Sequence, residues 1–249
     1  PTEAGQRLLD RLAPALLDID SALETLNAFR DSPVGTLRFN APRHAAEHVL
    51  APLANRFLLA NAGMRLEIVA DDAFVDIIQG GFDAGVRFGE SLDRDMVAIP
   101  LGPPQRFVVV GAPAYLTQAG RPSDPHELSR HRCIGIRFPS GARYRWEFEK
   151  AGEEMEVDVS GPLDVGEMPL MLRAAEDGLG LAYVYEETAR ASLAAGRLET
   201  VLDDWRPTEA GFFLYYPGRR LPSAGLQKFI ELVKESRVER TGTTPRASG

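Results

Sequence analysis

The sequence predicts an α/β fold that is divided into two parts. From residue 35 to residue 88, short apolar segments typical of strands alternate with segments typical of helices, which predicts a parallel sheet with right-handed crossovers. Two breaks, at residues 102–105 (GPPQ) and 205–207 (WRP), predict where the chain leaves this sheet and returns to it. A length of 249 residues, 44% of them hydrophobic, accommodates one large domain or two smaller ones.

The first 34 residues predict a helix that pairs with a second chain. Leucine and isoleucine recur at alternating steps of three and four residues, as in the seam of a coiled coil. The seam residues are Leu9, Leu12, Leu16, Ile19, Leu23 and Leu26. Pro14 removes one backbone hydrogen bond and should kink the helix. An amphipathic helix lying on its own domain is the alternative interpretation.

The first sheet follows this helix. Strands are predicted at residues 37–39, 66–68 and 82–88, and helices at residues 41–59 and 74–78. Pro42 suits the first turn of the longer helix, whereas Pro52 is an interior proline that splits it. Gly80 and Gly81 stop the shorter helix, because glycine tolerates the left-handed conformation that ends helices.

Arg87 lies near the C-terminal end of the third strand, close to Gly89. A charged side chain is costly to bury alone, and open α/β sheets bind ligands at the carboxyl ends of their strands. Arg87 is therefore a candidate for binding a carboxylate through its planar fork of donors. The helix start at Arg43 and His44 would add free backbone N–H groups. Alternatively, Arg87 pairs with a nearby Asp or Glu, or points into water.

The second half of the chain mixes short strands and helices. Strands are predicted at residues 96–101, 107–110, 133–138, 179–184 and 212–216, helices at 113–119, 125–130, 169–176, 186–195 and 226–233, and a hairpin at 143–149 with 155–159. Tyr144, Trp146 and Phe148 form an aromatic face on the hairpin, which packing explains without a ligand. From Arg237 onward the apolar content is too low to predict order.

Composition narrows the functional classes. The net charge of −8 argues against this chain gripping DNA by itself, because phosphate contacts need clustered Lys and Arg. Cys133 is the single cysteine, so no internal disulfide is possible and a reducing cytoplasm is expected. No segment approaches the roughly 18 apolar residues of a membrane span. The chain begins with Pro1, and we expect it to be a piece of a longer protein.

Two patterns are candidates for chemistry. His44, Glu47 and His48 match the H-x-x-E-H pattern of inverted zinc proteases, and a polar first turn of a helix is the simpler interpretation. His131 and Cys133 lie on one side of a strand as a possible base and nucleophile, but apolar neighbours favour a core thiol. No nucleophile elbow, P-loop or dinucleotide fingerprint is present. We therefore expect no catalytic residue, metal or cofactor.

The chain as a whole resembles a LysR-type transcriptional regulator without its N-terminal DNA-binding domain. Several segments carry the resemblance in order and spacing over about nine-tenths of the chain: GTLRFNAP (35–42), GGFDAGVRFGE (80–90), DMVAIPLG (95–102), VVVGAPAYL (108–116), HRCI (131–134), YRWEFEK (144–150), LMLRAAEDGLGLAY (170–183), GRLETVLDDW (196–205) and FFLYYPGRRLPS (212–223). TEAG (2–5) resembles the end of the family's winged helix-turn-helix domain, and the heptad helix resembles its linker helix.

The resemblance implies a fold like that of a periplasmic binding protein, with two subdomains and two crossovers. Its boundaries would be 1–34 for the dimerisation helix, 35–105 with 208–240 for subdomain I, 106–207 for subdomain II, and 241–249 for a disordered tail. It also implies an effector in the cleft between the subdomains. The implied effector-binding residues are Pro42, Arg43, His44, Asp71, Arg87, Phe88, Gly89, Leu101, Ile136, Arg137, Phe138, Gly166, Glu167 and Met168. Where this chain has Gly166-Glu167, close relatives usually have Asn-Asp, and Tyr185 replaces a usual proline.

Three functions compete. The first is the effector-sensing, dimerising region of a regulator that reaches DNA only through its N-terminal domain, as a homodimer or homotetramer without membrane contact. Its effector would carry a carboxylate or an aromatic group. The second is the solute-binding protein of a transport system, which shares the fold class. The third is a hydrolase built on the histidine pattern.

Overall fold

The computed structural model of the chain describes residues 2, 5–8, 12, 33–73, 75–88, 95–138, 140–209, 211–218 and 221–242. The chain divides into two compact units, Pro1–Gly102 with Gly211–Gly249 (unit 1) and Pro103–Ala210 (unit 2). Each contains its own sheet and helices, which confirms the predicted α/β class with two subdomains. Of the predicted heptad seam, only Leu12 lies among the described residues, and it is 45% exposed.

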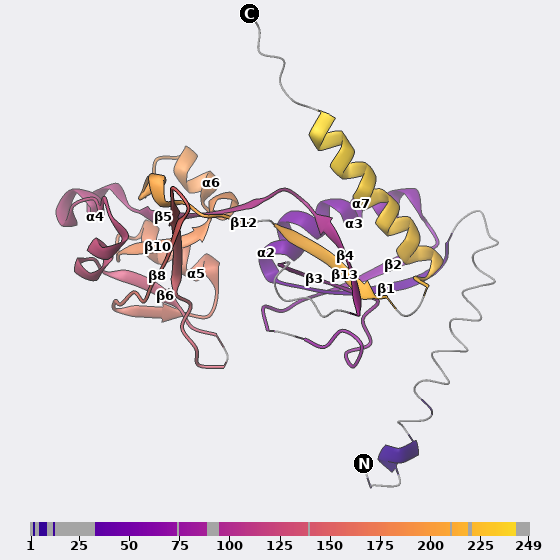
Figure 1. The fold of residues 1–249 in the computed structure, drawn as a ribbon. Helices are drawn as coiled ribbons and strands as arrows, with labels where there is room; N and C mark the ends of the chain where they lie inside the picture. The colour runs from indigo at the N-terminus through magenta and orange to yellow at the C-terminus, as the bar shows by residue number, and fades with distance from the viewer. Residues whose placement is uncertain are drawn as a thin grey trace, which may run out of the picture. The chain divides into compact units, whose positions relative to one another are not determined.

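Unit 1 is built on a five-stranded sheet in the order β2-β1-β3-β13-β4 (Figure 1). The strands are β1 (Gly35–Ala41), β2 (Met64–Ala70), β3 (Ala84–Phe88), β4 (Met96–Leu101) and β13 (Phe212–Pro217). As predicted, β1 runs parallel to β2 and β3. Strand β13, to which the chain returns after unit 2, lies between β3 and β4 and is antiparallel to both. It therefore completes the sheet of unit 1.

Two helices cover one face of this sheet. Residues 43–60 are helical in three consecutive segments, α2 (Arg43–Ala45), the π-helical η1 (Ala46–Leu50) and α3 (Ala51–Ala60). The change from π- to α-helix comes directly before Pro52, where the missing N–H was expected to split the helix. Phe39 of β1, Phe57 of α3 and Phe229 of α7 (Ala224–Gly242) form the centre of this core, with ring centroids 4.8 and 5.3 Å from Phe229.

The prediction of a short helix at residues 74–78 is wrong. The described residues Ile77–Gly81 form hydrogen-bonded turns instead. The carboxylate of Asp76 accepts hydrogen bonds from the backbone N–H groups of Ile78 and Gln79, at 2.9 and 3.1 Å. An aspartate that satisfies backbone donors in this way stabilises a turn in competition with a helix. Ile77 is nevertheless buried, so the apolar pattern identified the inward side chain correctly.

The disordered tail was predicted to begin too early. Helix α7 continues to Gly242, past Arg237 and through the first two residues of the 241–249 segment. The guanidinium of Arg56 on α3 donates to Ser236 Oγ at 3.0 Å and pairs with Glu239 at 3.1 Å. These contacts between helices hold the added turns, which the low apolar content alone would not. Residues 243–249 lie outside the described part of the chain.

Unit 2 contains a sheet in the order β11-β5-β10-β6-β9, with β12 paired to β5. The strands are β5 (Gln105–Gly111), β6 (Cys133–Ile136), β9 (Leu163–Val165), β10 (Leu181–Tyr185), β11 (Glu199–Val201) and β12 (Thr208–Glu209). The short helices between them are α4 (Pro113–Ala119), η3 (Pro125–Arg130), α5 (Met168–Glu176), α6 (Glu186–Ala194) and η4 (Asp203–Trp205). Strands β9, β6 and β10 are parallel, whereas β5 is antiparallel to β10.

The two faces of this sheet have different covers. Helices α5 and α6 cover one face, where their buried residues meet alternate side chains of β5 and β10. The hairpin of β7 (Trp146–Lys150) and β8 (Glu153–Val157) covers the other face with aromatic rings. Phe107 stacks on Tyr183 with centroids 4.8 Å apart, and Trp146 stacks on the same tyrosine at 5.5 Å. The prediction that this aromatic face serves packing is confirmed.

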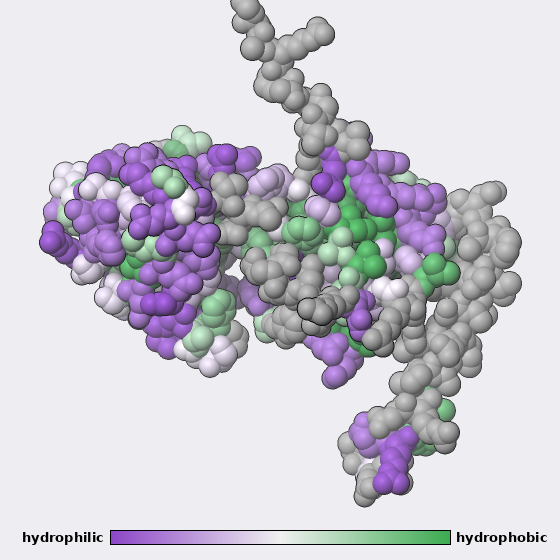
Figure 2. Space-filling view, viewed as in Figure 1, coloured by the Kyte–Doolittle hydropathy of each residue, from purple (hydrophilic) through white to green (hydrophobic). Residues whose placement is uncertain are grey.

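The visible surface of unit 2 is largely hydrophilic (Figure 2). Within the described parts of the chain, no helix is long and apolar enough to cross a membrane.

Candidate functional site

The C-terminal ends of β1, β2 and β3 bring together the residues predicted for unit 1. Because these strands are parallel, their carboxyl ends meet at one edge of the sheet. The backbone N–H of Asp71, just after β2, donates to the carbonyl of Ala41 at the end of β1, at 2.9 Å. We name this edge rim 1, and it comprises Pro42, Arg43, His44, Asp71, Asp72, Arg87 and Phe88.

The start of helix α2 differs from the prediction. The backbone N–H of Arg43 is not free, because it donates to Asp72 Oδ1 at 3.0 Å. The other oxygen of Asp72 lies 3.4 Å from the Arg43 guanidinium. A carboxylate of the chain itself therefore satisfies the backbone donor of Arg43 that was expected to be free.

Arg87 follows neither alternative drawn from the sequence. Its side chain is buried, with the residue only 7% exposed, and it donates to the carbonyl oxygens of Val86 and Ala73 at 2.8 Å. It also donates to Asn40 Oδ1 at 2.7 Å. Among the described residues, no carboxylate lies within ion-pair distance of Arg87. The acceptors around this guanidinium are neutral.

Burial dominates the electrostatics of Arg87. Removal from water lowers the pKa of its guanidinium, and the negative charges of Asp71 and Asp72 only partly oppose that effect. The positive charge is thus held at some cost within unit 1.

Aromatic rings border the same edge. Phe88 packs on Phe212 with centroids 4.4 Å apart, and the ring of His44 lies 6.1 Å from Phe212. Leu101, another predicted residue, is fully buried on β4 opposite Phe212. Gly89 lies outside the described residues. Rim 1 therefore combines charged groups with an apolar wall.

A second edge forms in unit 2. The parallel strands β6 and β9 end at neighbouring positions, and the Arg137 N–H donates to the carbonyl of Val165 at 2.8 Å. Phe138 is 38% exposed and meets Tyr144 edge to face. Met168 begins α5, and its sulfur accepts from the N–H of Tyr185 at 3.4 Å. We name this edge rim 2, and it comprises Ile136, Arg137, Phe138, Gly166, Glu167 and Met168.

The side chain of Arg137 is engaged in contacts with other residues of unit 2. It pairs with Asp164 at 3.0 Å and donates to the carbonyl of Gly141 at 2.9 Å, while Arg143 binds the second oxygen of Asp164 at 2.8 Å. Burial alone would raise the pKa of Asp164, but hydrogen bonds from the two arginines outweigh it and lower that pKa. Arg137 thus holds the loop that follows β6.

The residues of the two candidate chemical patterns, the histidine pattern and the His131–Cys133 pair, contact other side chains of the protein. The rings of His44 and His48 lie 4.6 Å apart, and Glu47 is 3.9 Å from His48 Nε2. In the described part of the chain, no three His, Cys, Asp or Glu side chains are placed to hold a metal. Cys133 is fully buried, and burial raises its pKa to about 12. Its neighbour His131 hydrogen bonds with the phenol of Tyr115 at 3.2 Å instead.

Three residues of the unit 1 edge were missed from the sequence. Asn40 and Asp72 bind two predicted residues, and Phe212 packs between two others. Asn40 gave no signal, because it falls at a polar position of the alternation that begins at Leu37. Phe212 is distant in the sequence and gave no local signal.

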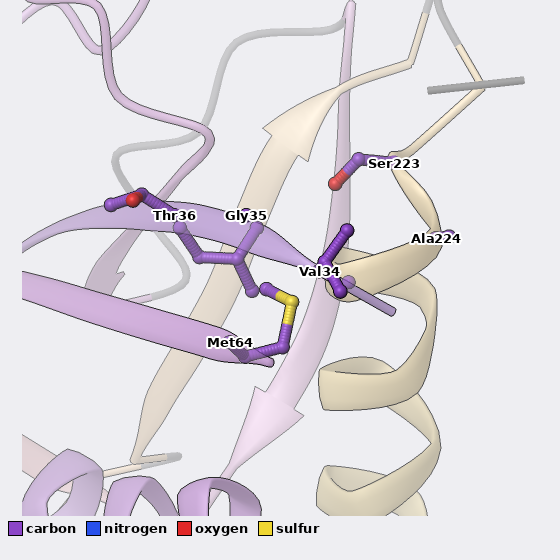
Figure 3. Close-up of a pocket in the computed structure, with 8 residues that line it drawn as sticks. Val34, Gly35, Thr36, Met64, Ser223 and Ala224 are labelled. Carbon is purple, nitrogen blue, oxygen red and sulfur yellow. The ribbon is translucent and has the colours of Figure 1, made fainter. Parts of the chain in front are cut away.

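A small cavity lies elsewhere in unit 1 (Figure 3). Residues 34–37, Met64 and residues 223–225 line it, and its volume of about 20 Å³ suits one water molecule. Gly225 lies close to Met64 there, because a Cβ atom at this position would lie 2.5 Å from the Met64 methyl group. The cavity is at the amino end of β1, about 20 Å along the strand from rim 1, and so it is separate from rim 1.

These features define a class of protein: a ligand-binding domain of the periplasmic-binding-protein type, with two α/β units that the chain crosses twice. Residues 30–237 match the LysR substrate binding domain. The chain is 39% identical over 237 residues to the uncharacterized HTH-type transcriptional regulator YcaN of Escherichia coli K12, covering 95% of this chain and 78% of that one. It is 36% identical over 235 residues to the HTH-type transcriptional regulator PgrR of the same organism, covering 94% and 79%.

Solved structures agree. CrgA, a LysR-type transcriptional regulator from Neisseria meningitidis, superimposes with a TM-score of 0.69 at 25% identity, covering 94% of this chain and 79% of that one. The virulence activator AphB of Vibrio cholerae superimposes with a TM-score of 0.71 at 22% identity, covering 94% and 80%. The chain belongs to the LysR-type transcriptional regulators and spans their effector-binding region. The transport alternative is not favoured, because these relatives are regulators.

Proposed function

We propose that this chain senses a small molecule through rim 1 and rim 2, and that the bound effector controls transcription by a protein that reaches DNA through a segment outside this sequence. The role is non-catalytic and cytoplasmic. A homodimer or homotetramer forms through the heptad seam, with boundaries between the linker helix and the two subdomains near residues 34, 105 and 207.

One observation carries the choice of site: three parallel strands of unit 1 end together, and each delivers a predicted residue to the same edge. Ligands of open α/β sheets bind at such edges. The edge offers charged side chains at Arg43 and Asp72 and rings at His44 and Phe88. In unit 2, the exposed ring of Phe138 offers a comparable contact.

The test is a thermal-shift screen of small carboxylates, aromatic acids and their neutral amides. For the compound with the largest shift, we compare Arg43→Gln with Arg65→Gln, which removes an exposed arginine from β2 away from the edge. We likewise compare Phe138→Ala with Leu59→Ala, which removes an exposed side chain from α3. The edge variants should lose most of the ligand-induced shift, and the controls should keep it. Equal shifts in all four variants would reject the proposed site.

A further inference from the structure

Asn40 is a fully buried amide near the carboxyl end of β1 in unit 1. From β1 it reaches both neighbouring strands: its Nδ2 donates to the carbonyl of Val69 on β2 at 3.4 Å, and its Oδ1 accepts from Arg87 Nη2 on β3 at 2.7 Å. Buried polar side chains are hydrogen-bonded because an unpaired group loses its hydration without compensation. Asn40 therefore fixes the orientation of the Arg87 guanidinium.

The character of Asn40 matters because Arg87 is charged. The other acceptors of its guanidinium are the carbonyl oxygens of Val86 and Ala73, so every acceptor found among the described residues is neutral. A buried cation is normally paired with an anion, since desolvation is otherwise uncompensated. Asp72 does not supply this anion, because its oxygens are directed to Arg43.

An aspartate would fit the same space. Aspartate and asparagine have nearly the same shape, and an aspartate at position 40 would place a carboxylate oxygen on the same donor of Arg87. The resulting ion pair would neutralise the guanidinium inside unit 1. The chain has the neutral isostere instead, and it holds the guanidinium beside Ala73, directly after two residues of rim 1.

We propose that Asn40 is a positioning residue that fixes Arg87 at rim 1 while leaving its positive charge to select an anionic effector. This inference rests on the proposed function and names the class of effector, a small molecule with a carboxylate or another planar anionic group. The rings of Phe88, Phe212 and His44 beside the same edge favour an aromatic or apolar body next to that anion.

The experiment compares benzoate with benzamide, a neutral molecule of nearly the same shape. The Arg87 Nε–H resonance is followed by NMR while each compound is added to the parent chain and to Asn40→Asp. Benzoate should shift this resonance in the parent chain and benzamide should not. In Asn40→Asp the affinity for benzoate should fall by about tenfold or more, because the new carboxylate competes for the same charge.

Two further variants separate this role from a structural one. Asn55→Asp adds the same charge to an exposed position of α3 and should leave benzoate binding unchanged. Asn40→Thr keeps a neutral acceptor and should retain the preference for benzoate. The inference is overturned if Asn40→Asp binds benzoate as the parent does, or if the parent does not distinguish the two compounds. In either case other molecules can still bind in the screen described above, so the proposed function is judged separately.

Discussion

The ring of Tyr215 lies over Gly85, its direct partner across β13 and β3. A Cβ atom at position 85 would come within 2.4 Å of the Tyr215 ring, far inside the normal separation of carbon atoms. Gly85 and Arg87 are two residues apart on β3 and therefore share a face of the sheet. The same tyrosine thus borders the buried guanidinium.

Gly85→Ala should consequently destabilise unit 1. The added methyl group must displace the Tyr215 ring, and overpacking of this kind costs about 1–3 kcal/mol. Thermal unfolding followed by circular dichroism should show a melting temperature lowered by about 3–10 °C. The control is Gly166→Ala, because the nearest atom to a Cβ there is 4.0 Å away. A melting temperature that is equally unaffected in both variants would show that Tyr215 moves aside without cost.

Asp83 predicts a pH-dependent effect. Burial raises the pKa of this carboxyl group, and the hydrogen bond from the Arg38 backbone N–H, at 2.7 Å, offsets burial only partly. A carboxyl group whose pKa is higher in the folded state opposes folding when ionised, and this opposition fades as the pH falls toward about 4. Asp83→Asn keeps an acceptor without the charge. It should therefore melt at a higher temperature than the parent at pH 7, with a smaller difference at pH 4.

Asp158→Asn is the matched control for that measurement. Asp158 is exposed, and its ion pair with Arg143 is long, at 3.9 Å. It should show no comparable gain at pH 7. A lower melting temperature for Asp83→Asn at pH 7 would mean that the charge interaction with Arg38 outweighs burial.

Local pattern was sufficient for much of the fold. Apolar side chains recur along β1, β3 and β10, and α5 and α6 end near Gly178 and Gly196, which have positive φ angles. The pattern failed where one distant or polar side chain decides the outcome. The carboxylate of Asp76 turns an apolar segment into a turn, and Arg56 holds the last turns of α7 from another helix.

The site shows the same division. The position of Arg87 at a strand end was readable, because strand ends follow from periodicity. The hydrogen-bond partners of Arg87 could not be predicted, since two are backbone carbonyls and the third, Asn40, is 47 residues away. Likewise, no local sequence pattern predicts that the Asp72 carboxylate accepts a hydrogen bond from the first residue of α2.

Cys133 should be inert in the folded chain. The thiolate is the reactive form of cysteine, and burial raises the pKa of this thiol to about 12. Iodoacetamide at pH 8 should leave the native chain unmodified and should label it fully in guanidinium chloride, as measured by intact mass spectrometry. Ser129→Cys provides an exposed thiol on η3 as a positive control. Rapid labelling of native Cys133 would contradict this prediction.

Self-association should depend on the heptad seam. Burying a leucine side chain contributes about 1.5–3 kcal/mol, so a few seam residues from each chain can offset the cost of association. Replacing Leu16 and Leu23 by Glu places charges in the seam and should weaken self-association by at least about tenfold. Sedimentation equilibrium measures this directly.

The control for the seam is Leu17→Glu. Leu17 neighbours Leu16 but lies off the three-four repeat, so the same chemical change there should leave association nearly intact. If Leu17→Glu disrupts the oligomer as strongly as the seam replacements, the contact is not a heptad seam. If neither replacement changes the sedimentation behaviour, the helix has another partner, and the amphipathic alternative, packing on its own domain, becomes the better interpretation.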